Sequence, residues 1–376
     1  MDQPEIALVG ANGWGRVHLD NIARLRAAGT ARLVALCDPA PLPAATLAAI
    51  GDVPVYSTLD ELLAAHRPAV TVLVTPIHTH AGLTAAALRA GSDVLLEKPP
   101  VTGLDEHAAL LALAEETGRS VQVGFQNLGS PAVAALAELA ADGSLGAVRG
   151  VGAAGRWIRD RRCYRRSRWA GRRRLDWVPV VDGSLTNPFA HSVQTALAIA
   201  GIAEGPLRTV EVELFRANDI EADDTGCVRV TSDSGPPVVV ATTLCASREH
   251  EPWVTVFGEA GTARLSYNHD RITVTTADGA RREHDFDRTD LLTNLLAHRA
   301  DPAAVQLLSP LAATAAFTQV LQAIRDAPDP TPIPSAHWQE LGTGDDAHRV
   351  LAGIDDDAAR AATDLALYSE LGLPWT

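Results

Sequence analysis

The feature that most constrains this fold is a regular alternation of short β-branched runs with helical patterns between Glu5 and about Gly124. Apolar runs of strand length separated by helices are typical of a parallel sheet covered on both faces. We expect strands at 6–10, 32–38, 54–56, 70–75, 93–98 and 121–125, and helices at 14–28, 60–66, 80–90 and 104–116. The sequence therefore predicts a doubly wound α/β domain over residues 1–127 that binds a nucleotide.

A second pattern begins after a helix expected at 131–141, because strands now follow one another at hairpin-like spacing. We expect strands at 148–156, 208–215, 226–232, 237–245, 253–257, 262–267 and 271–276, and helices at 188–200, 289–299, 307–325 and 355–371. A chain of 376 residues also exceeds the length at which single cores stop growing, about 250–300 residues. The sequence predicts a second α/β domain over 128–376 with a mainly antiparallel sheet.

Charge and composition exclude several classes of partner and site. A net charge of −14 repels phosphate backbones, so we expect no nucleic-acid partner. The N-terminal segment lacks the pattern of a secretory signal, and the apolar runs are shorter than the ~20 residues of a membrane span, which predicts a cytoplasmic protein with no membrane partner. The cysteines are far apart, which predicts no metal site and no disulfide framework; they are Cys37, Cys163, Cys227 and Cys245.

Lysine usage singles out one position, because the 32 basic residues include a single lysine, Lys98. A lysine ammonium is compact and loses its proton more readily when buried, whereas arginine stays protonated. That difference matters chiefly for proton transfer or for a tight polar pocket. The alternative is a surface lysine with no chemical role.

A glycine-rich turn follows the first expected strand. Gly10 and Gly15 satisfy the outer positions of G-x-G-x-x-G, with Asn12 at the middle glycine and Gly13 and Trp14 beside it. Such a turn lets backbone amides and a helix N-terminus approach a pyrophosphate. Asn12 tolerates a left-handed backbone, so we expect the turn to form and these five residues to contact a dinucleotide. The alternative is an ordinary strand-to-helix turn.

Asp38 ends the second expected strand, 23 residues after Gly15. A carboxylate at this place accepts the ribose hydroxyls of adenosine and repels a 2'-phosphate. The following Pro39–Pro41 segment supplies no arginine for such a phosphate. The sequence therefore favours NAD over NADP, and the alternative is that Asp38 only starts a turn.

Three further segments match motifs of one family, the glucose-fructose oxidoreductase and inositol dehydrogenase relatives (Gfo/Idh/MocA). The matching residues are Glu97, Lys98 and Pro99 for E-K-P; Thr75, Pro76 and His80 for T-P-x-x-x-H; and Gly183, Asn187 and His191 for G-G-x-x-x-[D/N]-x-x-x-H. Together they resemble this family over Gly10 to His191, with a looser likeness to about residue 276. The resemblance implies a Rossmann domain followed by an α/β domain with an open, mostly antiparallel sheet.

The resemblance also implies roles for these residues. Lys98 would reach the reacting oxygen and His191 would exchange its proton. Asn187 would contact substrate or, with Pro188, begin the helix as its N-cap, and in either case His191 would lie at the helix's positive end, which disfavours imidazolium. The cofactor would be contacted by residues of the other two motifs: Thr75, Pro76, His80, Glu97 and Lys98.

Ten arginines lie between Arg156 and Arg174. Trp169-Ala170-Gly171 partly matches a W-R-G loop that, in this family, closes over the cofactor, which places Trp169 among the cofactor residues. The bland alternative is a solvated or partner-facing loop. The functional alternatives are a grip on an anionic substrate or on the NAD phosphates.

The sequence thus predicts an NAD-dependent oxidoreductase acting on a secondary alcohol or ketone of a sugar, cyclitol or related polyol. One alternative is transient oxidation that ends in epimerisation or glycoside elimination. Another is a cofactor-binding regulator without turnover, against which the presence of both Lys98 and His191 argues. By resemblance, we also expect a homo-oligomer, a dimer or a tetramer.

Overall fold

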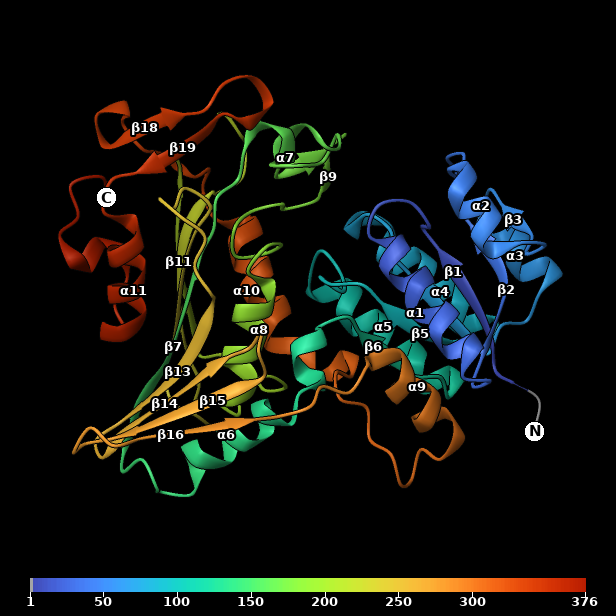
Figure 1. Cartoon of the computed structure of the whole chain (residues 1–376), viewed down its shortest axis with the longest axis horizontal. Helices are drawn as coiled ribbons and strands as arrows, with labels where there is room; N and C mark the ends of the chain where they lie inside the picture. Colours follow the sequence, from blue (N-terminus) through green and yellow to red (C-terminus); the bar gives the residue numbers. More distant parts are fainter. Residues whose placement is uncertain (1–2) are drawn as a thin grey trace. The chain divides into compact units, whose positions relative to one another are not determined.

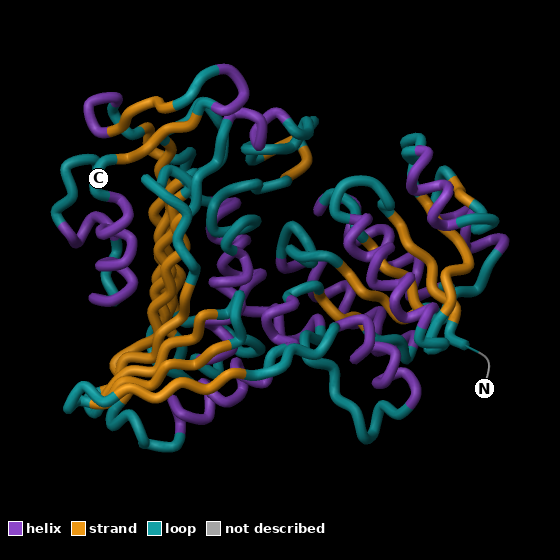
Figure 2. The backbone as a smooth tube through the Cα atoms, in the orientation of Figure 1, coloured by secondary structure: helices purple, strands orange, loops and turns teal. Residues whose placement is uncertain are grey.

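A computed structural model describes residues 3–376. The chain forms two compact units, each built from two segments. The first comprises Met1–Phe125 and Thr289–Ala312, and the second Gln126–Arg288 and Ala313–Thr376. Figures 1 and 2 show the sheet and helices of each unit.

The first unit contains a six-stranded parallel sheet in the order β3-β2-β1-β4-β5-β6. Its strands are β1 (Glu5–Val9), β2 (Arg32–Cys37), β3 (Val55–Tyr56), β4 (Val70–Leu73), β5 (Asp93–Leu96) and β6 (Val121–Val123). The connecting helices are α1 (Gly15–Ala27), α2 (Ala44–Ile50), α3 (Leu59–Ala65), α4 (His80–Arg89) and α5 (Leu104–Thr117). The predicted Rossmann fold is confirmed.

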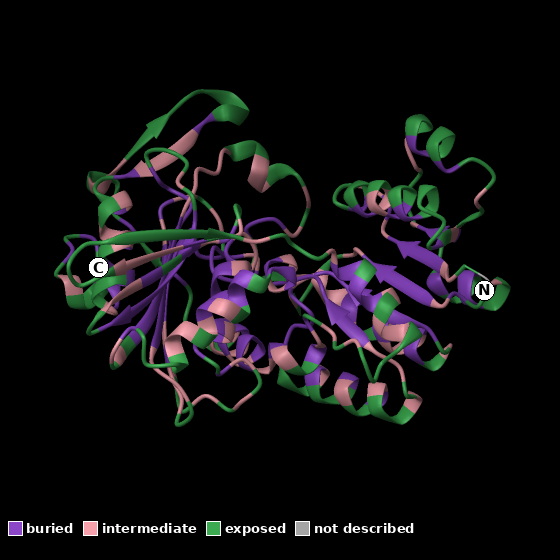
Figure 3. Cartoon of the chain, turned by 60° about the horizontal axis from the view of Figure 1, so that its bottom comes forward, coloured by how far each residue is buried: buried purple, intermediate pink, exposed green. Residues whose placement is uncertain are grey.

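The core of this unit explains the strand pattern of the sequence. All residues of β4 and β5 are buried, as expected for inner strands covered on both faces. Figure 3 shows these strands buried and the outer sides of the helices exposed. The core also contains Leu291, Leu292 and Leu295 from α9 (Leu291–Ala300). Residues 289–312 therefore belong to the first unit. The predicted division at 127/128 places them in the second domain.

The second unit contains a nine-stranded sheet in the order β16-β15-β14-β13-β7-β12-β11-β10-β17. Its strands are β7 (Val148–Arg156), β10 (Thr209–Arg216), β11 (Thr225–Thr231), β12 (Val238–Thr243), β13 (Trp253–Gly258), β14 (Gly261–Ser266), β15 (Arg271–Thr276), β16 (Arg281–Asp285) and β17 (Thr331–Pro332). The pairs β7–β12 and β10–β17 are parallel and the other pairs are antiparallel. The expected mostly antiparallel sheet is confirmed.

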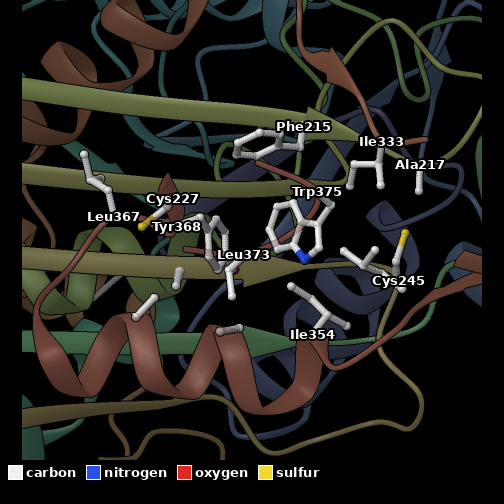
Figure 4. Close-up of a cluster of buried hydrophobic side chains, with 14 of the residues drawn as sticks. Phe215, Ala217, Cys227, Cys245, Ile333, Ile354, Leu367, Tyr368, Leu373 and Trp375 are labelled. Carbon is white, nitrogen blue, oxygen red and sulfur yellow. The ribbon is translucent and has the colours of Figure 1, made fainter. Parts of the chain in front are cut away.

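Helices lie on both faces of this sheet. On one face are α6 (Pro131–Ala141), α8 (Ala190–Ile199) and α10 (Ala315–Asp326), and on the other is α11 (Ile354–Asp364) (Figure 1). The chain after α11 continues over the same face, where Tyr368 and Trp375 pack against Phe215 of β10 (Figure 4). The inner strands of the sheet are therefore covered on the α11 face by the chain itself.

Several elements were not predicted from the sequence. They are α2, the edge strand β16, the short helix α7 (Arg161–Arg165), and two hairpins, β8 (Arg174–Leu175) with β9 (Val178–Pro179) and β18 (Trp338–Leu341) with β19 (His348–Leu351). The expected helix 355–371 ends at Asp364 instead. Within residues 3–376, no helix is both long and apolar enough to cross a membrane, and no three His, Cys, Asp or Glu side chains gather as metal ligands.

Candidate functional site

The glycine-rich turn joins β1 to α1. Gly10 has a φ of 84°, and a Cβ there would lie 2.1 Å from the carbonyl oxygen of Val74, so only glycine fits. The left-handed position of the turn is Gly13, with a φ of 58°, and not Asn12 as the sequence suggested. A Cβ on Gly15 would meet the carbonyl of Gly10 at 2.0 Å, so this glycine lets α1 start close against β1.

The start of α1 suits an anion. No side chain caps the helix, and its first turn contains no acidic residue. Its backbone amides and the positive end of the helix therefore meet no negative charge of the chain's own first turn. Trp14 stands at the N-cap with 58% of its surface exposed. These features fit the pyrophosphate of a dinucleotide.

Asp38 follows β2 and holds the same turn. Its Oδ2 accepts hydrogen bonds from the backbone amides of Ala11 and Asn12 at 3.0 and 3.1 Å, and from the Asn12 side-chain amide at 3.1 Å. Its Oδ1 accepts from the Ala40 amide at 2.9 Å. The carboxylate thus lies beside the turn that fits the pyrophosphate, half-buried, where an adenosine ribose would lie.

Four neighbouring strands bring the predicted cofactor residues to one edge of the sheet. Gly10, Asp38, Thr75 and Lys98 each follow the carboxyl end of a strand, in the spatial order β2-β1-β4-β5. Parallel strands present these ends at the same edge, which is where open α/β sheets bind ligands. The residues of three separate sequence motifs therefore share one edge.

His80 is the first residue of α4 and is held by two backbone carbonyls. The side chain is buried, with Nε2 2.7 Å from the Thr75 carbonyl oxygen and Nδ1 2.8 Å from that of Pro99. Burial lowers the pKa of His80, while the two carbonyls act in the opposite direction. His80 therefore connects the segment of Thr75 and Pro76 to the segment that contains Lys98 and Pro99.

Glu97 is buried beneath the loop that contains Lys98. Its Oε1 lies 2.8 Å from Nε2 of His18 on α1, and its Oε2 accepts a hydrogen bond from the Lys98 amide at 3.1 Å. A Cβ on Gly124 would come within 3.2 Å of the carboxyl group. The pair His18–Glu97, which the sequence did not reveal, joins the start of α1 to the backbone at Lys98.

His191 lies in the first turn of α8, as predicted. The predicted N-cap is wrong, because α8 begins at Ala190 and its N-cap is Phe189. The Asn187 amide instead donates to Oδ1 of Asp182 at 2.5 Å. The Asn187 side chain is therefore hydrogen-bonded to the carboxylate of Asp182 and does not cap the helix.

Asp182 is a neighbour of the candidate site residues that the sequence analysis did not identify. Its side chain is only 6% exposed and its Oδ2 accepts from the Gly171 amide at 2.7 Å. The guanidinium of Arg166 lies 3.5 Å from the same oxygen. A carboxylate thus lies next to the Asn187 side chain. The Asp-Gly pair at 182–183 gave no signal of this contact.

Asp223 fixes the segment that leads to His191. Its Oδ2 accepts from the backbone amide and the hydroxyl of Ser184, at 2.8 and 2.6 Å. A Cβ on Gly183 would lie 1.9 Å from Oδ1, so the glycine makes room for the carboxyl. Burial raises the pKa of Asp223, and the bonds from Ser184 act against this.

Trp169 belongs to the arginine-rich segment of the second unit. The Arg166 guanidinium lies 5.0 Å from its ring centroid, at cation–π distance. Because Arg166 and Gly171 both contact Asp182, this segment is tied to the loop that contains Asn187. Trp169 belongs to the second unit and Lys98 to the first.

Two family profiles match the chain. Residues 5–125 match the oxidoreductase family with an NAD-binding Rossmann fold, and residues 133–264 match the GFO/IDH/MocA C-terminal domain. Together the two matches cover more than half of the chain, one in each predicted domain.

Curated relatives include two inositol 2-dehydrogenases. That of Rhizobium meliloti strain 1021 is 26% identical over 289 residues, which is 75% of this chain and 82% of that protein. That of Rubrobacter xylanophilus is 33% identical over 143 residues, 38% of this chain and 41% of that protein. The second alignment therefore spans less than half of the relative's length.

Solved structures share the fold of both units. The WlbA dehydrogenase of Bordetella pertussis, in complex with NADH and UDP-GlcNAcA, is 23% identical and has a TM-score of 0.70 over 89% of this chain and 100% of that one. An oxidoreductase of Agrobacterium radiobacter, in complex with NAD+, L-tartaric acid and magnesium, is 16% identical and has a TM-score of 0.69, covering 86% and 95% of the two chains.

Proposed function

The chain belongs to the Gfo/Idh/MocA family of oxidoreductases with an NAD-binding Rossmann domain, and on this premise we propose that it oxidises a secondary alcohol of a sugar, cyclitol or related polyol. The observation that supports this most is the meeting of Gly10, Asp38, Thr75 and Lys98 at one edge of the sheet. That edge combines a dinucleotide site with the chain's single lysine. Relatives named inositol 2-dehydrogenase favour a polyol as substrate.

When bound, NAD supplies the acceptor for the substrate's hydride. The chain's own residues supply binding and proton transfer. The first turn of α1 binds the pyrophosphate, and Asp38 accepts the ribose hydroxyls. Lys98 donates a hydrogen bond to the reacting oxygen, and His191 accepts its proton. Asn187, oriented by Asp182, contacts a neighbouring hydroxyl of the substrate.

Cofactor choice tests the role of Asp38. We expect Asp38→Ala to weaken NAD binding and to favour NADP relatively, because the change removes the acceptor for the ribose hydroxyls and the repulsion of a 2'-phosphate. Loss of a charge-assisted hydrogen bond should cost about 10-fold or more in the dissociation constant of NAD. Calorimetric titration with both cofactors measures this, with Asp52→Ala at an exposed position as control. A wild type that binds NADP more tightly than NAD contradicts the assignment.

The reaction itself is tested by following NADH formation over a panel of sugars and cyclitols. A dehydrogenase should give stoichiometric NADH with one chemical class of the panel. Product formed without net NADH would instead indicate transient oxidation with the cofactor retained. If NAD binds and no member of the panel is converted, the proposed polyol oxidation is wrong.

A further inference from the structure

The arginine-rich segment lines a cavity that the proposed chemistry does not use. The cavity measures about 700 Å³, a volume typical of ligand sites. All of its lining residues belong to the second unit. Its wall contains six arginines: Arg161, Arg165, Arg168 and Arg172 from the segment after β7, Arg216 from β10 and Arg349 from β19.

Carboxylates balance most of this charge. The partners are Glu340 for Arg161 and Arg349, Asp345 for Arg165, Asp176 for Arg168 and Glu221 for Arg172. Of these carboxylates only Glu221 lies in the wall, which also contains Asp219, so two carboxylates and six guanidinium groups line the cavity. In the part of the chain that the structure describes, Arg216 is the one of the six without a carboxylate partner. It donates to the Ile220 carbonyl at 3.1 Å.

The paired arginines remain available to a ligand. In the four pairs made by the segment after β7, the arginine side chains are between 43% and 78% exposed. Exposed ion pairs contribute only about 0–1 kcal/mol each, so a ligand with several anionic oxygens can replace such a partner. Planar guanidinium groups match phosphate and carboxylate geometry.

Two hydroxyl groups in the same wall point to a ligand independently of the charge. The hydroxyl oxygens of Tyr164 and Ser167 are buried, and neither has a hydrogen-bond partner among residues 3–376. A buried polar group without a partner costs about 1–3 kcal/mol, a cost that a hydrogen bond to a ligand would remove. Burial also raises the pKa of Tyr164 well above its usual value, so the group is a neutral donor.

One carboxylate connects this cavity to the candidate catalytic segment. Gly171 belongs to the cavity wall and donates its amide hydrogen to Asp182, which also accepts from Asn187. The wall of the cavity and the loop before His191 are therefore fixed by the same side chain.

We propose that this cavity binds an anionic group, phosphate or carboxylate, carried by the substrate, so that the enzyme prefers anionic sugars or cyclitols to neutral ones. The proposal rests on the proposed polyol oxidation. Arg216 and the hydroxyls of Tyr164 and Ser167 bind the oxyanion, and the paired arginines close around it.

Binding is tested first, on protein saturated with NAD so that the cofactor's own phosphates are excluded. Inorganic phosphate and malonate are titrated separately by calorimetry, which distinguishes the two anion types. We expect saturable binding of at least one, weakened about 10- to 100-fold by Arg216→Gln and less by Tyr164→Phe. Arg282→Gln, which removes an exposed arginine of β16 outside the cavity, should bind like the wild type. The proposal is overturned if neither anion binds, or if both cavity variants bind as the wild type does.

Kinetics then separate this proposal from the proposed function. Arg216→Gln should lower kcat/KM for anionic sugars and leave that for neutral sugars unchanged. If neutral sugars are oxidised and Arg216→Gln leaves the ratio of kcat/KM for anionic to neutral sugars unchanged, the proposed anion site is wrong. The proposed polyol oxidation is then unaffected. If phosphate binds through Arg216 but no sugar of either kind is oxidised, the proposed function fails, and with it the assignment of the anion to a substrate.

Discussion

Lys98→Arg should lose most turnover, about 100-fold or more, although it preserves the positive charge. Arginine is larger, holds its donors in a planar fork and has no accessible neutral form. Lys98 is half-buried after β5, in a loop whose backbone is held by Glu97 and braced by His80 through Pro99, so the site cannot expand easily. Lys98→Met should be equally damaging because it removes the donor.

Affinity for NAD should change far less in both variants, since the pyrophosphate and ribose sites lie at Gly10–Gly15 and Asp38. Turnover on the identified substrate and calorimetric titration of NAD measure the two effects separately. Arg89→Lys, the reverse exchange at an exposed position of α4, is the matched control and should be silent. A Lys98→Arg enzyme that retains wild-type turnover would remove the lysine from the mechanism.

The second large effect is expected for His191→Ala. Removal of a general base typically lowers turnover by about 100- to 10,000-fold. The side chain lies in the first turn of α8, where alanine is a good helix residue, so the melting temperature should stay near that of the wild type. NAD affinity should also be retained, which places the defect in the chemical step.

His284→Ala provides the control, because this histidine lies exposed on β16 of the same unit. Equal turnover of the wild type and His191→Ala would show that His191 has only a structural role.

Elements with a clear local pattern of apolar residues were predicted from the sequence. The apolar runs of β4 and β5 and the helix 131–141 lie where they were expected. By contrast, β16 has the sequence RREHD and all five of its residues are exposed, so it lacks any apolar signal. Residues 289–312 belong to the first unit because the leucines of α9 pack in its core. The contacts join residues far apart in the sequence, so local pattern does not predict them.

Some residues of the candidate site were likewise predicted from the sequence, and others were not. The glycine-rich turn, Asp38 and Lys98 are recognisable because each follows a strand at a fixed offset. The contacts of Asp182 with Asn187 and of Asp223 with Ser184 join separate loops, and no spacing rule announces them. Asn187 followed by proline has the local sequence of a cap, but a nearby buried carboxylate forms the stronger, charge-assisted hydrogen bond.

The C-terminal cover of the nine-stranded sheet limits how copies of the chain could associate. Over the inner strands, the α11 face of the sheet is already occupied by Ile354, Tyr368 and Trp375. Beside α11, the same face contains the cross-strand row Thr255, Arg264 and Thr273, of which Thr255 is buried and Arg264 is exposed. The Arg264 guanidinium stacks 4.2 Å from the Trp253 ring centroid, and its Nε donates to Thr255 at 3.0 Å. Self-association through this face would therefore join polar surfaces.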